Sequence, residues 1–374
     1  MQTHCSSLFA EERPVILLQM IRKETDPIPI PIDSELPTRS RVGRERRAEY
    51  RGRRPPFLLW GILLFISGVM CYLFGVALGV PRALFQLDSL YAFNQAIVWY
   101  SGIPVVFGIA LALIDILYLF EHKRFFAPVQ FAQLENQQVT VALTAYNDEL
   151  SIGESVCDFL AHPRVARVIV VSNSSRDATL ARAREAGAIA FNEEAVGYGH
   201  CVYRCLTEAT RFEDVDLVVL CEGDMTFRAF DIDKLLAYAA HADIVNGTRT
   251  SEPLRERNTQ LSTFMFYGNI FVGKLLEAKH LGRITLTDVG TTYKLCHRAM
   301  LPDLLKRLNP TINLEFNAHF VDTAIGAGRT VVECPITFHP RVGVSKGGNI
   351  NNWRGFTVGL RMIAGIVFGW KAKR

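Results

Sequence analysis

The chain has 374 residues, of which 49% are hydrophobic and 21% charged, and its formal net charge is +4. This length suits one large domain or two smaller ones, and the high apolar content directs attention to membrane-spanning segments. The eight cysteines are scattered and form no CxxC pair, so the sequence predicts neither a disulfide framework nor a cysteine-based zinc site.

Residues 1–56 are predicted to form a disordered basic tail. Four prolines lie between residues 27 and 37, and eight arginines follow between residues 39 and 54. Apart from Tyr50, no aromatic residue interrupts the arginine run, which argues against a nucleic-acid-binding arm. Because an apolar run begins directly afterwards, we interpret the arginines as the positive flank of a membrane segment.

Residues 57–125 are predicted to form a transmembrane helical hairpin. The first span, about 57–80, contains no charged residue and is long enough to cross a bilayer core of about 30 Å. The second span, about 99–120, has one charge, Asp115, which could reach headgroups or a helix partner. The alternative is that both segments are buried core helices.

The charges around this hairpin predict its orientation. The connection, residues 81–98, holds only Arg82 and Asp88, whereas basic residues flank both outer ends of the hairpin. By the positive-inside rule, the chain is expected to be an integral membrane protein whose N-terminus and catalytic domain are cytoplasmic.

Apolar runs typical of strands alternate with helical patterns from residue 139 onward. This alternation predicts an α/β domain with a mostly parallel sheet covered on both faces. The expected strands are 139–145, 168–172, 188–192, 217–221, 244–247 and 330–338; the expected helices are 149–161, 177–186, 198–211, 230–241, 257–279 and one within 310–328.

Polar clusters follow three of these strands, at 146–148, 172–175 and 222–224. Ligands bind beyond the carboxyl ends of parallel strands, so the three clusters predict a binding site at one edge of the sheet. Glu222 and Asp224 are candidate ligands for Mg²⁺ or Mn²⁺, which prefer oxygen donors and leave room for phosphate oxygens. A surface turn is the alternative.

Two later segments also carry candidate chemistry. Residues 288–295 bring together Asp288, two hydroxyls and Lys294, which suggests an acceptor site with a phosphate-binding cation or, alternatively, a capped loop entering a strand. The glycine-rich segment 341–348 carries Arg341, Ser345 and Lys346, which could gather phosphate oxygens or form a basic loop.

The C-terminal segment, residues 351–374, is predicted to be an amphipathic helix. Its apolar stretch from Gly355 to Trp370 has one charge, Arg361, and is too short to span a membrane comfortably. The helix is expected either to lie in the membrane interface or to pack against the core.

Residues 139–350, within an expected domain at 136–350, resemble the family 2 glycosyltransferases of GT-A fold. The resembling strings are Thr144-Ala145-Tyr146-Asn147-Asp148-Glu149, the segment 172–179, Glu222-Gly223-Asp224 in place of D-x-D, Asn246-Gly247-Thr248-Arg249, and the segment 288–295. Residues 332–336 followed by 341–346 resemble "V-E-V-P-I…R-x-G-x-S-K", which points to the polyprenyl-phosphate glycosyltransferases, a group that includes dolichol-phosphate mannose synthases.

The resemblance implies a role for each matching position. The donor would be a UDP- or GDP-linked sugar, the metal would be Mg²⁺ or Mn²⁺, and Asp224 would be the safer ligand because Glu222 replaces an aspartate. Ser172 and Asn173 replace a pair of aspartates, and Lys294 replaces an arginine. Substrate contacts are expected from Ala145, Tyr146, Asn147, Glu149, Ser172, Asn173, Asp177, Arg249, Lys294, Arg341, Ser345 and Lys346.

The predicted function is therefore that of a membrane-anchored inverting glycosyltransferase with a polyprenyl-phosphate acceptor. If the acceptor is instead a glycan or lipid hydroxyl, a base is needed, and Asp288 is the candidate. A degenerate, non-catalytic nucleotide-sugar-binding membrane protein is the alternative from another class. A processive polysaccharide synthase is not supported, because the sequence contains no Gln-x-x-Arg-Trp string.

Overall fold

The computed structural model describes residues 55–119, 131, 134, 137–343 and 351–371. Nearly all of the predicted basic tail, residues 1–56, lies outside the described residues, and so do Ser345 and Lys346.

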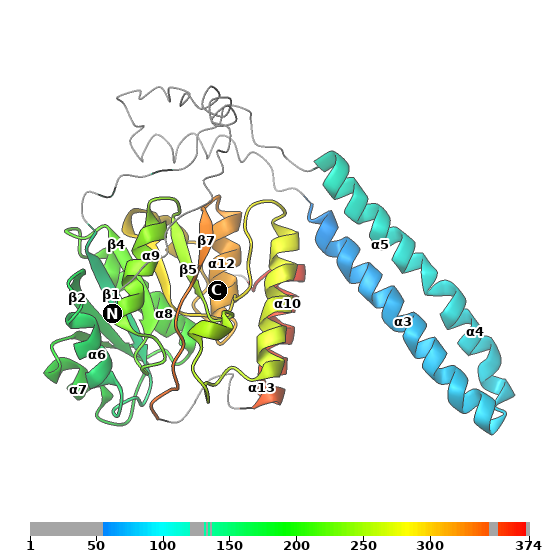
Figure 1. Ribbon diagram of the computed structural model, residues 1–374, viewed down its shortest axis with the longest axis horizontal. Helices are drawn as coiled ribbons and strands as arrows, with labels where there is room; N and C mark the ends of the chain where they lie inside the picture. Colours follow the sequence, from blue (N-terminus) through cyan, green and yellow to red (C-terminus); the bar gives the residue numbers. More distant parts are fainter. Residues whose placement is uncertain (1–54, 120–130, 132–133, 135–136, 344–350, 372–374) are drawn as a thin grey trace, which may run out of the picture. The chain divides into compact units, whose positions relative to one another are not determined.

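Two long apolar helical segments form an antiparallel pair at residues 57–119 (Figure 1). Both are long and apolar enough to cross a membrane by length and composition, and most of their side chains are exposed. The connection between them is shorter than the predicted 81–98, because Pro81 lies inside the first helix and does not end it. The elements are α3 (Phe57–Phe85), η2 (Asp88–Leu90), α4 (Tyr91–Tyr100), α5 (Gly102–Ile114) and η3 (Asp115–Leu119).

Glycines let the two helical segments approach closely. Gly61, Gly68 and Gly75 are spaced by seven residues along α3 and face the returning segment. A Cβ atom on Gly61 would lie 2.5 Å from the carbonyl oxygen of Gly108, which is closer than atoms can approach. Asp115 Oδ2 accepts a hydrogen bond of 2.7 Å from the backbone N–H of Leu58. Asp115 thus reaches a helix partner and satisfies a free donor at the start of α3.

The second part of the chain is built on a seven-stranded sheet in the order β3-β2-β1-β4-β6-β5-β7. Strand β6 is antiparallel to both of its neighbours, and the remaining pairs are parallel. The predicted α/β class is confirmed: a mostly parallel sheet follows two long apolar helices. The strands are β1 (Val139–Ala145), β2 (Val165–Ser172), β3 (Ile189–Asn192), β4 (Leu217–Glu222), β5 (Ile244–Thr248), β6 (Lys294–His297) and β7 (Val331–Pro335).

Helices cover both faces of this sheet (Figure 1). The central strands β1 and β4 are buried on both faces, as expected from their high content of apolar residues. One face is covered by α6 (Ile152–Leu160), α7 (Thr179–Glu185) and α9 (Ile232–Ala239), and the other by α8 (Tyr198–Thr210), α11 (Leu301–Leu305) and α12 (Phe316–Gly326).

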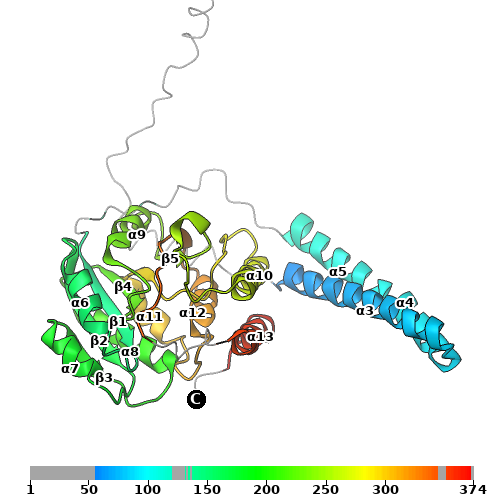
Figure 2. The same ribbon diagram turned by 60° about the horizontal axis from the view of Figure 1, so that its bottom comes forward.

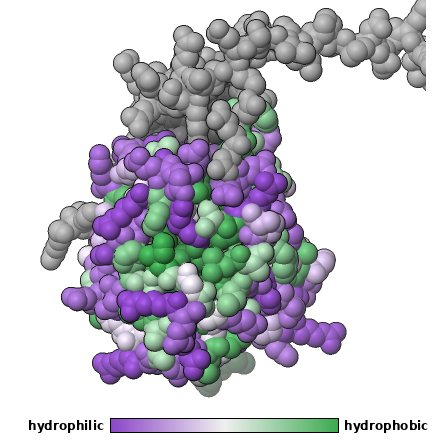
Figure 3. Space-filling model, turned by 90° about the vertical axis from the view of Figure 1, so that its left-hand side faces the viewer, coloured by the Kyte–Doolittle hydropathy of each residue, from purple (hydrophilic) through white to green (hydrophobic). Residues whose placement is uncertain are grey.

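Two further helices, α10 (Thr263–Lys279) and α13 (Asn352–Phe368), pack side by side next to α12 (Figures 1 and 2). Both carry large apolar side chains that remain exposed, among them Phe264, Tyr267, Phe271, Trp353 and Leu360. The face of the α/β part shown in Figure 3 also carries hydrophobic residues, and hydrophilic ones border them.

Candidate active site

The ends of β1, β2 and β4 bring the three predicted polar clusters together. The backbone N–H of Asn173 donates to the carbonyl of Ala145 at 2.9 Å, and that of Gly223 donates to Thr144 at 3.0 Å. A Cβ atom on Gly223 would lie 2.4 Å from Ile152 Cδ1, so a larger residue at this position would require the Ile152 side chain to move. The prediction that these clusters meet at one sheet edge is confirmed.

The loops that leave these strands hold the backbone in an unusual conformation. Asn147, Ser174 and Met225 each have a positive φ, at 51°, 56° and 66°. Each is the second or third residue past the end of its strand. Non-glycine residues in this region carry a modest conformational cost, and such residues cluster at ligand sites. The positive φ of Met225 falls directly after Asp224, one of the candidate metal ligands.

A cluster of opposite charges lies at the centre of this edge. Asp224 and Asp148 are both buried, and Arg341 bridges them. Arg341 Nη1 lies 2.8 Å from Asp224 Oδ2, and Nη2 lies 2.7 Å from Asp148 Oδ1. The other oxygen of Asp224 accepts bonds from the N–H and hydroxyl of Thr226. Arg341, from the predicted segment 341–346, therefore connects the polar cluster after β1, which contains Asp148, with the cluster after β4, which contains Asp224.

Glu222 lies beside Asp224 in a second hydrogen-bonded group. Its Oε1 accepts a bond of 2.6 Å from the hydroxyl of Thr292, which also pairs with the Tyr198 hydroxyl. The amide of Asn317 donates to Thr292 Oγ1 at 3.2 Å and to the Tyr198 oxygen at 3.1 Å. Burial, with the nearby charge of Asp224, raises the pKa of Glu222 to about 7.

The donor set suits a hard divalent cation that takes its remaining ligands from elsewhere. No cluster of three or more His, Cys, Asp or Glu side chains suited to a metal occurs within the described parts of the chain. Asp224 and Glu222 offer two carboxylates, and the buried Oδ2 atom of Asp224 is paired with Arg341. Mg²⁺ and Mn²⁺ commonly use one or two carboxylates together with substrate phosphates, so these residues fit such an ion.

Asp288 is buried and holds Arg249 in place. Arg249 Nε and Nη2 donate to its two carboxylate oxygens at 2.7 and 2.9 Å, and Asn269 donates to Oδ1 at 2.8 Å. Burial alone would raise the pKa of Asp288, but the charge and hydrogen bonds of Arg249 outweigh burial and lower it. This environment suits a positioning residue better than the proton acceptor predicted from the sequence.

Lys294 occupies the first position of β6 and is fully buried. Its Nζ donates to the carbonyl of Thr291, and burial lowers its pKa to about 8. Lys294 is not among the residues that line the cavity described below, and its contact with a substrate phosphate stays a prediction. The sequence Thr291-Thr292-Tyr293-Lys294 gave no indication that strand β6, which begins at Lys294, would be buried.

The residues expected to hold the nucleotide divide into two groups. Ala145, Tyr146 and Asn173 line the cavity, with the Asn173 side chain bonded to Ala195 and Gly197. The other four residues hold the loops together and do not line this cavity: Asn147 accepts from Arg176, Glu149 from Ala178, Asp177 from Glu149 and Thr179, and Ser172 bonds Ser175.

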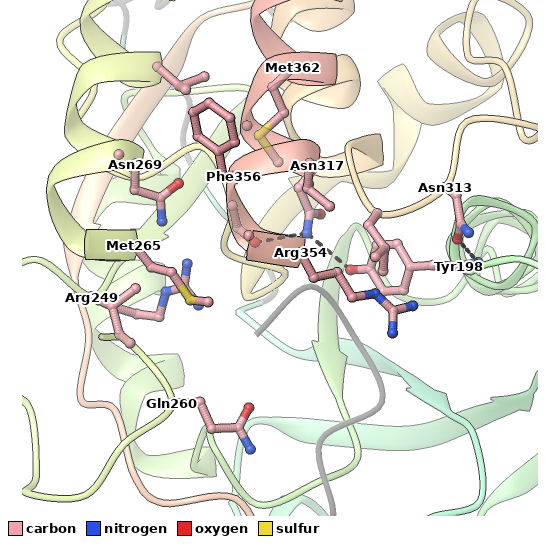
Figure 4. A pocket seen from close by; sticks show the side chains of 18 of the residues that line it. Tyr198, Arg249, Gln260, Met265, Asn269, Asn313, Asn317, Arg354, Phe356 and Met362 are labelled. Atoms are coloured by element: carbon pink, nitrogen blue, oxygen red, sulfur yellow. Dashed lines mark hydrogen bonds between the residues drawn. The ribbon is translucent and has the colours of Figure 1, made fainter. Parts of the chain in front are cut away.

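A single cavity of about 1290 Å³ joins this polar edge to the α10–α13 pair. Its polar end is lined by Asp148, Glu222, Asp224, Arg249 and Arg341. Its other end is apolar and lies between the two helices, where Met265, Phe356 and Met362 face it (Figure 4). The cavity can therefore hold a molecule with one anionic end and one hydrocarbon end.

Several polar lining residues were not predicted from the sequence, among them Tyr198, Asn317 and Arg354. Tyr198 begins α8, Asn317 is a buried amide in the otherwise apolar start of α12, and Arg354 lies in the first turn of α13. The one available signal was Asn317, because a polar residue inside an apolar helix face usually needs a partner. Arg354 lies directly before the apolar stretch 355–370, and no role was predicted for it from the sequence.

Comparisons with known proteins place this chain near sugar-transferring enzymes. No protein-family model matches. Over 221 residues, the chain is 27% identical to the low-salt glycan biosynthesis hexosyltransferase Agl6 of Haloferax volcanii, covering 55% of this chain and 48% of Agl6. It is 26% identical over 113 residues to protein RfbJ of Shigella flexneri, covering 30% of this chain and 84% of RfbJ. The match thus spans about half the length of Agl6.

Solved structures of similar fold include glucosyl-3-phosphoglycerate synthase from Mycobacterium tuberculosis. The complex with phosphoglyceric acid superposes with a TM-score of 0.46 at 17% identity, covering 62% of this chain and 80% of that one. The complex with Mn²⁺, uridine diphosphate and glucosyl-3-phosphoglycerate gives 0.45 at 18% identity, covering 63% and 82%.

Proposed function

We propose that this chain is a membrane-anchored glycosyltransferase that moves a sugar from a nucleotide-diphosphate sugar to a polyprenyl phosphate. The observation that carries the proposal is the cavity that joins buried carboxylates to an apolar space between α10 and α13. The similarity to the hexosyltransferase Agl6 supports the transferase class. The apolar space favours a lipid over a water-soluble acceptor, because hydrocarbon gains from leaving water.

The donor would bind at the edge formed by β1, β2 and β4. Tyr146 and Asn173 would contact the nucleoside, and Asp224 with Glu222 would hold Mg²⁺ or Mn²⁺. Such an ion supplies charge neutralisation for the departing diphosphate. Arg341, released from the carboxylates, would be free to bind phosphate oxygens.

The reaction would be a single displacement with inversion. An oxygen of the acceptor phosphate attacks the anomeric carbon, the bond from that carbon to the nucleotide diphosphate breaks, and the diphosphate leaves with the bonding electron pair. A phosphate is already anionic, so no general base is required. The rate gain would come from positioning and from charge neutralisation.

A hydroxyl acceptor on a glycan or lipid is the second candidate, and it needs a base. Asp288 would fill that role, yet both of its oxygens are bonded to Arg249 and Asn269. This geometry favours the phosphate acceptor. A non-catalytic nucleotide-sugar-binding protein is the third candidate. It would bind the donor but transfer no sugar, unlike the two enzyme candidates.

The membrane arrangement is part of the same proposal. The hairpin 57–119 would span the bilayer, with the α/β domain in the cytoplasm. Helix α13 would lie in the interface beside α10, since both expose aromatic side chains, including Trp353, Phe264 and Tyr267. The apolar end of the cavity would then open toward the lipid.

The test uses membranes that contain this protein, polyprenyl phosphate, Mn²⁺ or Mg²⁺, and labelled UDP- and GDP-sugars, with Asp224→Ala as control. Label that enters an organic-extractable, mild-acid-labile product, and does so only with the unmodified chain, supports the proposal. Label found only in water-soluble glycan points to the hydroxyl acceptor. Donor binding without turnover on any acceptor would support the non-catalytic alternative.

A further inference from the structure

Three arginines line the cavity, and two of them already have anionic partners. Arg249 is paired with Asp288, and Arg341 with Asp148 and Asp224. The guanidinium of Arg354 makes no ion pair or side-chain hydrogen bond with any residue between 55 and 371 that the structure describes. A guanidinium that faces a cavity without a partner carries donors available to a ligand.

Arg354 is placed where the polar and apolar ends of the cavity meet. Its backbone N–H is held by the side chain of Asn351 at 2.8 Å, which fixes the first turn of α13. Figure 4 shows its side chain extending into the cavity on the side of Tyr198, while Phe356 and Met362 of the same helix line the apolar part. Helix α13 therefore contributes a cation, Arg354, and then apolar side chains, Phe356 and Met362, to the lining of the cavity.

This order of groups matches a specific ligand chemistry. A phosphate monoester on a hydrocarbon chain carries its charge at the point where the apolar part ends. A guanidinium binds phosphate through two parallel N–H donors, which a single ammonium does not offer. The donor diphosphate, in contrast, would lie at the carboxylate end with the divalent ion and Arg341.

We infer that Arg354 binds the phosphate of the acceptor lipid and so determines that the acceptor is a phosphate ester. The inference rests on the proposed function and assigns a residue outside every motif used for it. A phosphate could also belong to the donor, so the two substrates are examined separately.

The experiment compares the full chain with Arg354→Gln and Arg354→Lys in detergent. Arg361→Gln is the matched control, because Arg361 is, like Arg354, an exposed cation on the same helix but does not line the cavity. Initial rates are measured while varying farnesyl phosphate and, separately, the nucleotide sugar. In parallel, equilibrium binding of labelled farnesyl phosphate and of farnesol is measured without donor.

For Arg354→Gln we expect the KM for farnesyl phosphate to rise on the order of 10- to 100-fold, the range for loss of a charge-assisted bond. The KM for the nucleotide sugar and kcat at saturating lipid should stay within about twofold. Farnesol binding should not change, and Arg354→Lys should recover part of the affinity. Arg361→Gln should match the unmodified chain.

The inference is overturned if Arg354→Gln leaves farnesyl phosphate affinity unchanged, or if only the donor KM rises. It is also overturned if the unmodified chain binds farnesyl phosphate no more tightly than farnesol. Failure of the proposed function has a different signature, namely no transfer to lipid by the unmodified chain with any donor. In that case the binding comparison alone decides the role of Arg354.

Discussion

Arg341 Nη1 lies 2.8 Å from Asp224 Oδ2, while its Nη2 lies 2.7 Å from Asp148 Oδ1. One guanidinium therefore pairs with two buried carboxylates that the sequence separates from it by more than a hundred residues. Asp224 is also the proposed metal ligand, so a divalent ion and Arg341 would compete for the same oxygen. This relationship leads to the first two predictions.

Asp224→Asn is expected to reduce Mn²⁺-dependent nucleotide binding and activity on the order of 100-fold or more, because a neutral amide is a poor ligand for a hard cation. Asp216→Asn is the control, since Asp216 is an exposed carboxylate just before the same strand. Calorimetric titration of a UDP- or GDP-sugar, with and without Mn²⁺, measures the effect. Equal metal dependence in both variants would contradict the assignment.

Arg341→Gln is expected to destabilise the protein by about 3–5 kcal/mol without metal, because it leaves buried carboxylates unpaired. Mn²⁺ should restore part of the lost stability by supplying another cation. Lys274→Gln removes a surface partner of Glu277 and should cost less than about 1 kcal/mol. Thermal unfolding in detergent, with and without Mn²⁺, tests this, and a loss that Mn²⁺ does not reduce would argue against competition at Asp224.

The affinity for Mn²⁺ is expected to depend on pH through Glu222. Its pKa is raised to about 7 by burial and by Asp224, so below pH 7 the carboxyl carries a proton that must leave before it can bind metal. Affinity should fall up to about tenfold per pH unit below 7 and level off above it. Glu222→Gln should bind more weakly at pH 8 and lose this dependence. Electron paramagnetic resonance of free Mn²⁺ from pH 6 to 8 measures it, and an unchanged slope in Glu222→Gln would assign the titration to another group.

Gly61→Leu is expected to disrupt the helical hairpin, at a cost of about 1–3 kcal/mol or more, because its Cβ would meet the carbonyl of Gly108 at 2.5 Å. Gly79→Leu is the matched control on the same helix, since a Cβ there meets nothing within 4 Å. The melting temperatures of the two variants in detergent give the comparison. Similar losses in both would mean that close packing at Gly61 does not hold the hairpin together.

Much of this architecture follows from local sequence patterns. The boundaries of β1 were predicted to the residue, and the buried runs of β2 and β4 were located, because strands buried on both faces read as unbroken apolar segments. The two long apolar helices and the meeting of three polar clusters at one sheet edge were also predicted, since parallel strands end on the same side. For Asp115, a helix partner was one of two alternatives, and the structure shows its hydrogen bond from Leu58 of α3.

Other features depend on contacts between distant parts of the chain, which no local pattern encodes. Strand β6 inserts antiparallel between β4 and β5, which buries Lys294 in the sheet and carries Asp288 onto Arg249. Arg341 meets Asp148 across 193 positions of sequence. The sequence by itself determined most of the elements, though not strand β6, together with the polar edge and the apolar segments, because periodicity and strand ends are local. Only the tertiary structure decided which charges pair and that Arg354 of α13 faces the cavity, because burial and pairing depend on the packing of distant segments.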